Sequence, residues 1–272
     1  MIIKLKEIQQ LETYMLRTIV KIFSDNKIRY FLNCGSVLGA VRHSGTIPWD
    51  MDVDIIVPQT DYERMIKILN KKLSDDLFID YYLTNKNYHR LFARVGVKGC
   101  SSYNLHIDIF PLVGLPRGIK NQLEYSKKSE RLCSLFNYKQ VNNRKTKNAF
   151  NRIAREILSK TIMIDPNRIF SAFIEHCNLY SYETSEYVMN PCGHYGIKNI
   201  LPKIYFGEGT QLKYEGIDVC VPSRYDVYLS HYYNNYMSYP SEKEQHMWDD
   251  FSISIDDEQA IRRILETYKN CD

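Results

Sequence analysis

The chain has 272 residues, with a hydrophobic content of 44% and a charged content of 25%, which is typical of a globular protein with a sizeable core. Its formal net charge of +4 is too small for the basic surface of a nucleic-acid-binding protein, although it is compatible with an anionic substrate or a membrane surface. The seven cysteines are irregularly spaced and form no Cys-x-x-Cys pair, which indicates reduced thiols and argues against a structural zinc site.

The beginning of the chain does not have the uninterrupted apolar segment of a signal peptide. No apolar run approaches the ~18 residues that a transmembrane helix needs. We therefore expect a cytoplasmic protein, and leave open a peripheral contact with the inner face of the cell membrane.

Residues 5–24 carry apolar side chains three and four positions apart, which predicts an amphipathic helix, and residues 28–33 are predicted to form a buried strand. The strand leads to Gly35 and Ser36, where a new helix can begin. Free backbone N–H groups and a serine hydroxyl at such a point can bind phosphate, so both residues are candidate substrate ligands. Alone this signal is weak, because Gly-Ser pairs are common in turns.

Residues 47–58, IPWDMDVDIIVP, place Asp50, Asp52 and Asp54 at every second position, with apolar residues following and between them. A period of two is that of a β-strand, so the three carboxylates are predicted on one face. Strand interiors usually avoid Asp, and three carboxylates repel one another unless a cation lies between them. The predicted cation is Mg²⁺, as one or two ions that Mn²⁺ could replace. The alternative is a solvated polar edge that discourages aggregation.

Arg42 and His43 precede this acidic segment. An arginine fork suits phosphate oxygens, so both are candidate substrate ligands. The alternative for Arg42 is a structural bridge to one of the aspartates.

A helix from Thr60 to about Lys72 is predicted to precede two strands of a meander, at 77–83 and 88–98. Arg94 interrupts the second strand. It is either a further phosphate ligand or an ordinary surface arginine.

Residues 104–112, NLHIDIFPL, predict another strand, with Asp108 inside an apolar run that Pro111 closes. An unpaired aspartate is costly to bury there. We expect the metal bound by the acidic segment to supply its counter-charge.

Residues 117–180 are predicted to be mostly helical, and one helix opens with Asp165 as N-cap and Pro166 at its first position. A helix is also expected around residues 150–158. The basic residues of 117–148 could favour an anionic lipid surface, although a solvated face is the plainer interpretation.

Residues 181–272 predict short strands, a hairpin at 210–222, a helix opened by Ser223 and a last helix near the end. Glu215 and His246 are further candidate substrate ligands. Their alternatives are a plain hairpin residue and a surface histidine.

Taken together, these signals indicate an enzyme that catalyses phosphoryl or nucleotidyl transfer. Asp52 and Asp54 can hold metal at the phosphates of a donor, and Asp108 can hold a second metal or accept the proton of the attacking hydroxyl. The set resembles the nucleotidyltransferase superfamily, whose fold is α+β, with a mixed β-sheet core flanked by helices. On this basis residues 1–272 form one catalytic domain, with the core at about 1–116, a helical insertion at about 117–180 and a C-terminal α/β elaboration at about 181–272.

The resemblance is closest to the LicD family of phosphotransferases, and the catalytic domain of fukutin-related protein resembles the same pattern. It is carried by the segments GSVLGAVRHSGTIPWDMDVDI (35–55), HIDIFPL (106–112), YEG (214–216) and YYNNYMSYP (232–240). The family commonly has Asp where this chain has Met51, so one carboxylate is missing here.

The resemblance implies Mg²⁺-dependent transfer of a phosphoalcohol from a CDP-alcohol to a sugar hydroxyl, with release of CMP. The alcohol would be choline, and the acceptor a glycan or lipid-linked glycan of the teichoic acid, lipopolysaccharide or capsule type. Phosphoribitol, phosphoglycerol and phosphoethanolamine are alternatives. Two other interpretations stay open: a nucleotidyltransferase that moves NMP from an NTP to a small substrate, and a binding module with a decayed site.

Overall fold

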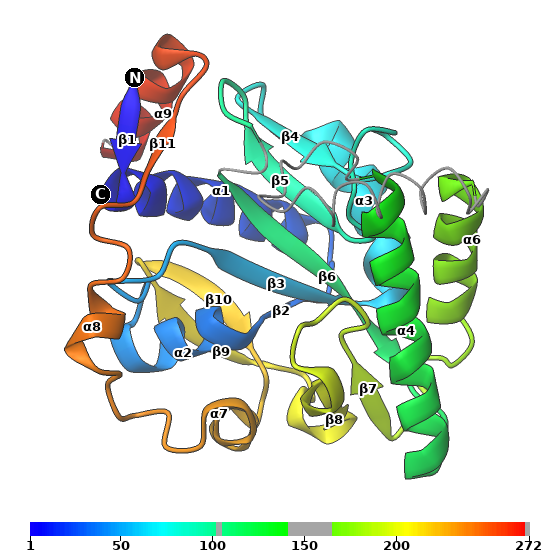
Figure 1. Ribbon diagram of the computed structural model, residues 1–272. Helices are drawn as coiled ribbons and strands as arrows, with labels where there is room; N and C mark the ends of the chain where they lie inside the picture. Colours follow the sequence, from blue (N-terminus) through cyan, green and yellow to red (C-terminus); the bar gives the residue numbers. More distant parts are fainter. Residues whose placement is uncertain (102–104, 141–164, 270–272) are drawn as a thin grey trace, which may run out of the picture.

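The computed structural model describes residues 1–101, 105–140 and 165–269 (Figure 1). Its centre is a mixed sheet with the strand order β2-β3-β6-β5-β4, to which β7 and β8 are added beyond the far end of β6. The strands are β2 (Phe31–Leu32), β3 (Val53–Pro58), β4 (Leu77–Asp80), β5 (Ala93–Val97), β6 (His106–Gly114), β7 (Tyr187–Met189) and β8 (Ile200–Pro202). A mixed sheet flanked by helices confirms the expected α+β class in its coarse form.

Strand pairing sets which side chains meet at the centre of the sheet. The parallel pair β3–β6 aligns Asp54 with Asp108, and the antiparallel pair β5–β6 aligns Arg94 with Asp108. Residues opposite each other in paired strands project from the same face. Three charged residues from three strands therefore lie in one row.

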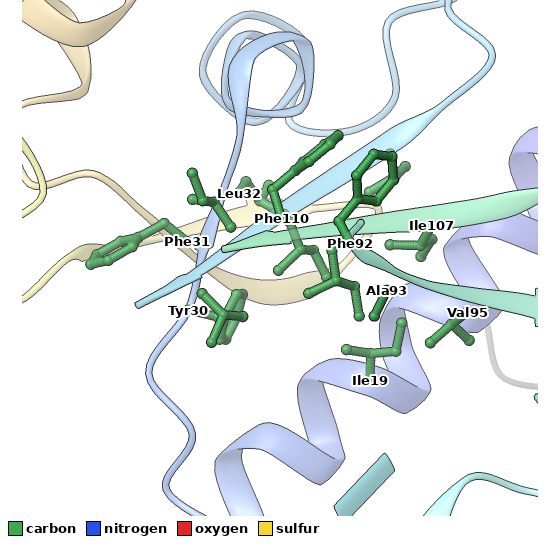
Figure 2. Close-up of a cluster of buried hydrophobic side chains, with 14 of the residues drawn as sticks. Ile19, Tyr30, Phe31, Leu32, Phe92, Ala93, Val95, Ile107 and Phe110 are labelled. Carbon is green, nitrogen blue, oxygen red and sulfur yellow. The ribbon is translucent and has the colours of Figure 1, made fainter. Parts of the chain in front are cut away.

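The other face of the sheet is apolar and packs on helices α1 (Leu5–Asp25) and α3 (Gln59–Lys72). Figure 2 shows Ile19 of α1 next to Ala93 and Val95, whereas Phe92 and Phe110 point to the opposite side of the sheet. Ile19, Ala93 and Val95 are all fully buried. Each large apolar side chain buried here contributes about 1.5–3 kcal/mol, so this layer holds the sheet in place.

The remaining elements surround this core (Figure 1). α4 packs against α6, and α2 packs against β9 and α7. The elements are α2 (Cys34–His43), α4 (Ile119–Gln140), α6 (Pro166–Cys177), η1 (Gly196–Asn199), η2 (Lys203–Tyr205), β9 (Thr210–Tyr214), β10 (Ile217–Val221), α7 (Tyr225–Tyr233) and α8 (Glu242–Gln245). No helix in the described ranges is both long and apolar enough to cross a membrane.

A small sheet joins distant parts of the chain: β1 (Ile2–Lys4) pairs antiparallel with β11 (Ser252–Ser254). The last helix, α9 (Glu258–Lys269), packs on α1 next to them. The sequence predicted α9 but gave no indication of this strand pair.

Several predicted boundaries need correction. The acidic segment is not one strand, because β3 begins only at Val53. α3 begins at Gln59, before the expected Thr60, and β6 continues past Pro111. α7 is preceded by Arg224, so Ser223 is not its N-cap.

The predicted hairpin of β9 and β10 is confirmed, and β4 pairs with β5, although β4 ends at Asp80 and β5 begins only at Ala93. Asp165 caps α6 as expected, because its side chain accepts a hydrogen bond from the Asn167 amide, and Pro166 is the first helical residue. The helix expected around 150–158 lies outside the described residues.

Candidate active site

The centre of the site is an ion pair between Arg94 and Asp108. The guanidinium donates from Nη2 to Asp108 Oδ2 at 3.1 Å, and its Nε donates to Oδ1. The Asp108 side chain is only 13% exposed, so the pair compensates a charge that would be costly to bury alone. Arg94 is therefore not a surface arginine, and it supplies the counter-charge that we expected from a metal.

Asp54 lies next to this ion pair in β3, and Asp52 lies in the loop that precedes the strand. Burial and the negative charges of Asp50 and Asp108 raise the pKa of Asp52 to about 7, although its side chain still reaches solvent. Burial and the same acidic neighbours raise the pKa of Asp54 well above its usual range. Among the described residues, neither Asp52 nor Asp54 forms an ion pair with a basic side chain.

Asp50 is held by the loop that contains it. The Gln9 side chain of α1 donates to the Asp50 carbonyl at 2.7 Å, and the Met51 amide donates to Asp50 Oδ1 at 3.0 Å. Burial raises the pKa of Asp50. A Cβ atom at Gly35 would lie 3.1 Å from Asp50 Oδ2, so the glycine allows α2 and this carboxylate to approach closely.

Ser36 connects α2 to the strand that carries Asp54. Its buried hydroxyl accepts a hydrogen bond from the Asp54 amide at 2.8 Å. The helix begins at Cys34, so Gly35 and Ser36 lie in its first turn, as predicted. This bond uses a lone pair of the hydroxyl oxygen, so the Ser36 hydroxyl can still donate its hydrogen to another acceptor.

Arg42 connects α2 to residues 236–239, which lie far away in the sequence. Its Nη1 donates to the carbonyls of Tyr236 and Ser238 at 2.9 and 3.1 Å, and its guanidinium carbon lies 5.0 Å from the Tyr239 ring centroid. His43 accepts a hydrogen bond from Arg42 Nε at 3.0 Å. Arg42 bridges to none of the described aspartates, so that alternative is wrong.

Glu215 and His246 lie in different surroundings. Glu215 has a φ of 47° in the β9–β10 turn, and its Oε1 accepts a hydrogen bond from the Thr46 amide at 3.0 Å. The Glu215 amide donates to the Ser44 carbonyl at 2.9 Å, so this residue braces the loop before the acidic segment. His246 follows α8, is 68% exposed and pairs with Asp249 Oδ2 at 2.7 Å.

Glu12 of α1 is a member of this acidic group that sequence reasoning missed. Its side chain is 1% exposed, and Oε2 has no hydrogen-bond partner within the described part of the chain. Burial raises the pKa of Glu12 well above its usual range, and the charges of Asp52 and Asp50 raise it further. One signal was available: Glu12 lies on the apolar stripe of an amphipathic helix, next to Leu11 and close to Met15.

Tyrosines from two separate segments lie within the electrostatic influence of Asp52 and Asp54. Tyr195, which precedes η1, is 44% exposed and hydrogen-bonds with Tyr233 of α7, and its ring centroid lies 5.1 Å from that of Tyr232, with the two rings tilted by 56°. Burial raises the pKa of Tyr195, and among further causes the charges of Asp54 and Asp52 add to the shift. These tyrosines come from segments far from the acidic loop, so no spacing in the sequence could identify them.

The donor atoms of the site suit a hard cation. Clustered carboxylate oxygens with raised pKa values and an unpaired Glu12 oxygen are what a divalent ion would compensate. Across the residues the structure describes, however, no three His, Cys, Asp or Glu side chains are arranged to hold a metal ion. Mg²⁺ usually takes only one or two carboxylates and completes its shell with water and substrate phosphates, so the residues present fit it.

Enzymes that transfer phosphate groups hold metal and phosphate with carboxylates and helix starts, and both kinds of group meet at this place in the sheet. Residues 27–164 match the family described as LicD/FKTN/FKRP, nucleotidyltransferase domain. The chain therefore belongs to the LicD family of phosphotransferases.

Two relatives show how far the similarity extends. The chain is 27% identical over 232 residues to lipopolysaccharide cholinephosphotransferase LicD of Haemophilus influenzae, a match that covers 80% of this chain and 86% of that protein. It is 30% identical over 95 residues to ribitol 5-phosphate transferase FKRP of Homo sapiens, a match that covers 35% of this chain. The second match covers only 19% of FKRP.

Proposed function

We propose that this protein transfers phosphocholine from CDP-choline to a sugar hydroxyl of a cell-surface glycan precursor and releases CMP. The observation that carries the proposal is the alignment of Asp54 with the Asp108–Arg94 ion pair, beside Asp52, in a chain of the LicD family. The similarity to a lipopolysaccharide cholinephosphotransferase over most of the chain favours choline and a glycan acceptor. FKRP is named for ribitol 5-phosphate, so phosphoribitol, phosphoglycerol and phosphoethanolamine remain alternatives.

Asp52 and Asp54 are the residues that would hold Mg²⁺, because among the described side chains no cation is paired with them. When bound, the ion would neutralise charge on the donor diphosphate. The first turn of α2 lies at the same place. Its Cys34 amide donates to the Tyr228 hydroxyl and its Ser36 amide to the Asn33 carbonyl, so the Ser36 hydroxyl is the group that would hold a phosphate oxygen.

Asp108 would act on the acceptor. Arg94 fixes the orientation of its carboxylate, which then accepts a hydrogen bond from the acceptor hydroxyl. The hydroxyl oxygen attacks the phosphorus that carries the alcohol, and the bond from that phosphorus to the bridging oxygen of CMP breaks. The hydroxyl proton passes to the Asp108 carboxylate.

The tyrosines favour choline among the alcohols. A quaternary ammonium is stabilised by aromatic faces, each worth about 0.5–2 kcal/mol, and by a nearby negative charge. Tyr195 has a partly exposed ring and hydrogen-bonds with Tyr233. The carboxylates of Asp52 and Asp54 supply the negative charge. Ribitol and glycerol carry no positive charge and would gain less from this arrangement.

The test is to incubate the purified protein with Mg²⁺ and separate CDP-alcohols, with and without a glycan extract, and to measure CMP. We expect CMP from CDP-choline, reduced at least about 100-fold in Asp52→Asn and Asp108→Asn. Asp218→Asn is the matched control, because Asp218 is an exposed β10 residue whose only ion pair among the described residues is with Lys213. CMP from another donor would keep the reaction and change the alcohol, whereas pyrophosphate from an NTP without CMP release would overturn the proposal.

A further inference from the structure

A cavity of about 370 Å³ lies beside the acidic site, between the segment before β5, helix α4 and the loop that leads into η1. The residues that matter for its chemistry are Arg90, Phe92, Glu130, Asn137, His194 and Gly196. Its volume is within the range of pockets that bind small molecules. None of these residues was predicted to contribute to the site.

The cavity borders the Asp108 end of the site. Phe92 lines the cavity, and the guanidinium carbon of Arg94, which holds Asp108, lies 5.7 Å from the Phe92 ring centroid. Figure 2 shows Phe92 beside Phe110, and these rings are 4.4 Å apart. Whatever occupies the cavity is therefore next to the proposed base.

His106 is a second neighbour of Asp108 in β6. Its Nε2 lies 3.5 Å from Asp108 Oδ1.

The charges of the cavity select the kind of ligand. A phosphate would be attracted by Arg90 but repelled by Glu130. A choline ammonium would be attracted by Glu130 but repelled by Arg90. A neutral polyol meets no such conflict, because each of its hydroxyls both donates and accepts hydrogen bonds. Arg90 donates, Glu130 accepts, and the Asn137 amide does both.

Two further features favour a sugar ring. The Nε of Arg90 is enclosed and has no hydrogen-bond partner within the described residues, so a ligand hydroxyl would satisfy a buried donor that is costly to leave unpaired. The ring of Phe92 offers an apolar surface for the C–H face of a sugar.

We propose that this cavity is the subsite for the acceptor sugar, held by Arg90 and Glu130 with its reacting hydroxyl toward Asp108. The inference rests on the proposed function, because it assigns the acceptor of that reaction. Tyr195 and His194 are neighbours on one loop, and His194 lines the cavity whereas Tyr195 lies near Asp52 and Asp54. The loop thus separates the acceptor sugar from the alcohol of the donor.

Binding is tested first, without catalysis. The 272-residue chain is mixed with the methyl glycosides of galactose, glucose and N-acetylglucosamine, and saturation-transfer NMR measures contact with each. We expect transfer to at least one glycoside, reduced at least about fivefold in Arg90→Met and Glu130→Gln. Arg131→Met is the matched control, because Arg131 is the exposed neighbour of Glu130 on α4 and does not line the cavity. Thermal unfolding of each variant checks that it is folded.

Kinetics then separates the two substrates. With CDP-choline and a glycoside that binds, Arg90→Met and Glu130→Gln should raise the acceptor KM roughly tenfold and leave the donor KM unchanged. A raised donor KM with an unchanged acceptor KM would show that the cavity holds the donor, and absence of glycoside binding to the unmodified protein would equally overturn the inference. If no CDP-alcohol is used, the proposed function fails, while the NMR experiment still decides what the cavity binds.

Discussion

Arg94 and Asp108 occupy neighbouring strands at the centre of the molecule, and each is almost inaccessible to solvent. Asp52 and Asp54 lie beside them without a basic partner among the described residues. The acidic group therefore contains two kinds of carboxylate: Asp108 is oriented by the Arg94 guanidinium, whereas Asp52 and Asp54 are the carboxylates that we propose for an exchangeable cation. This difference gives the ion pair a structural role, in addition to the catalytic role that we propose for Asp108.

Removing one member of the pair should expose this structural role. In Arg94→Met the Asp108 charge stays buried without its partner, and we expect the free energy of unfolding to fall by about 3–5 kcal/mol. The double variant Arg94→Met/Asp108→Leu should recover much of that loss, because it leaves no buried charge. Urea unfolding at pH 7 in EDTA measures both. If the double variant were no more stable than the single one, Arg94 would stabilise the protein through other contacts.

At the scale of elements, the packing of α4 on α6 depends on an uncharged histidine. His176 of α6 is buried, its ring stacks 3.8 Å from that of Tyr125 of α4, and its Nε2 lies 3.0 Å from Ser129 Oγ. Burial lowers the pKa of His176 to about 4, and the charge of Lys128 also contributes to the shift. The stacked pair thus joins the two helices only while the imidazole is neutral.

The pH dependence of stability follows from this shift. The unfolded chain protonates His176 below about pH 6.5, whereas the folded protein resists protonation until about pH 4. The contribution of His176 to the free energy of unfolding should therefore decrease as the pH falls from 6.5 to 4, by up to about 1.4 kcal/mol per unit. His106, whose pKa is lowered in the same way, adds to this decrease, whereas the raised pKa values of Asp52 and Asp54 act in the opposite direction. His176→Phe keeps a ring on Tyr125 and should lower the slope of unfolding free energy against pH relative to the unmodified protein, while His246→Gln, at an exposed histidine, should leave it unchanged. An equal slope in His176→Phe would assign the pH dependence to other groups.

At the scale of the whole molecule, the end of the described chain supports the site from a distance. β11 pairs with β1, and α9 packs on α1, whose Gln9 holds the Asp50 loop. This segment places Ile253, Ile261 and Ile264 in the core.

Truncation after Asp250 should therefore weaken both stability and activity. Each of the buried isoleucines lost contributes about 1.5–3 kcal/mol, so we expect a lower thermal midpoint. We also expect CMP release to fall, because the start of α1 would no longer be anchored. Calorimetry and the CMP assay measure the two effects, and full activity in a truncated protein with a lower midpoint would show that the Asp50 loop does not need this anchor.

Features that depend on local sequence signals could be predicted, whereas features that depend on contacts between distant segments could not. The first helix, the cap of Asp165 with Pro166 and the β9–β10 hairpin were predictable, because caps, turns and periodicity are local. The alternation of Asp50, Asp52 and Asp54 led to a wrong strand boundary, since Asp50 closes a turn through its amide bond to the Ile47 carbonyl and Asp52 lies in the loop before β3. The candidates Asp52, Asp54 and Asp108 do lie in one acidic group.

The partners of those aspartates could not be predicted. Arg94 meets Asp108 only through the register of β5 with β6, and Glu12 joins the group only because α1 packs near the acidic loop. The strand pair β1–β11 and the tyrosines beside Asp54 also depend on contacts between distant segments. Such contacts follow from the complete fold, and no local sequence rule describes them.

The parallel pairing of β3 with β6 has a consequence for how the protein is made. Asp54 and Asp108 are roughly fifty residues apart in the chain, and parallel strands cannot be joined by a tight turn. Contacts between distant residues form slowly, since the entropy of closing a long loop must be overcome first. During synthesis, the row of charged residues cannot exist until β6 has left the ribosome, so a partly made chain carries no assembled candidate active site.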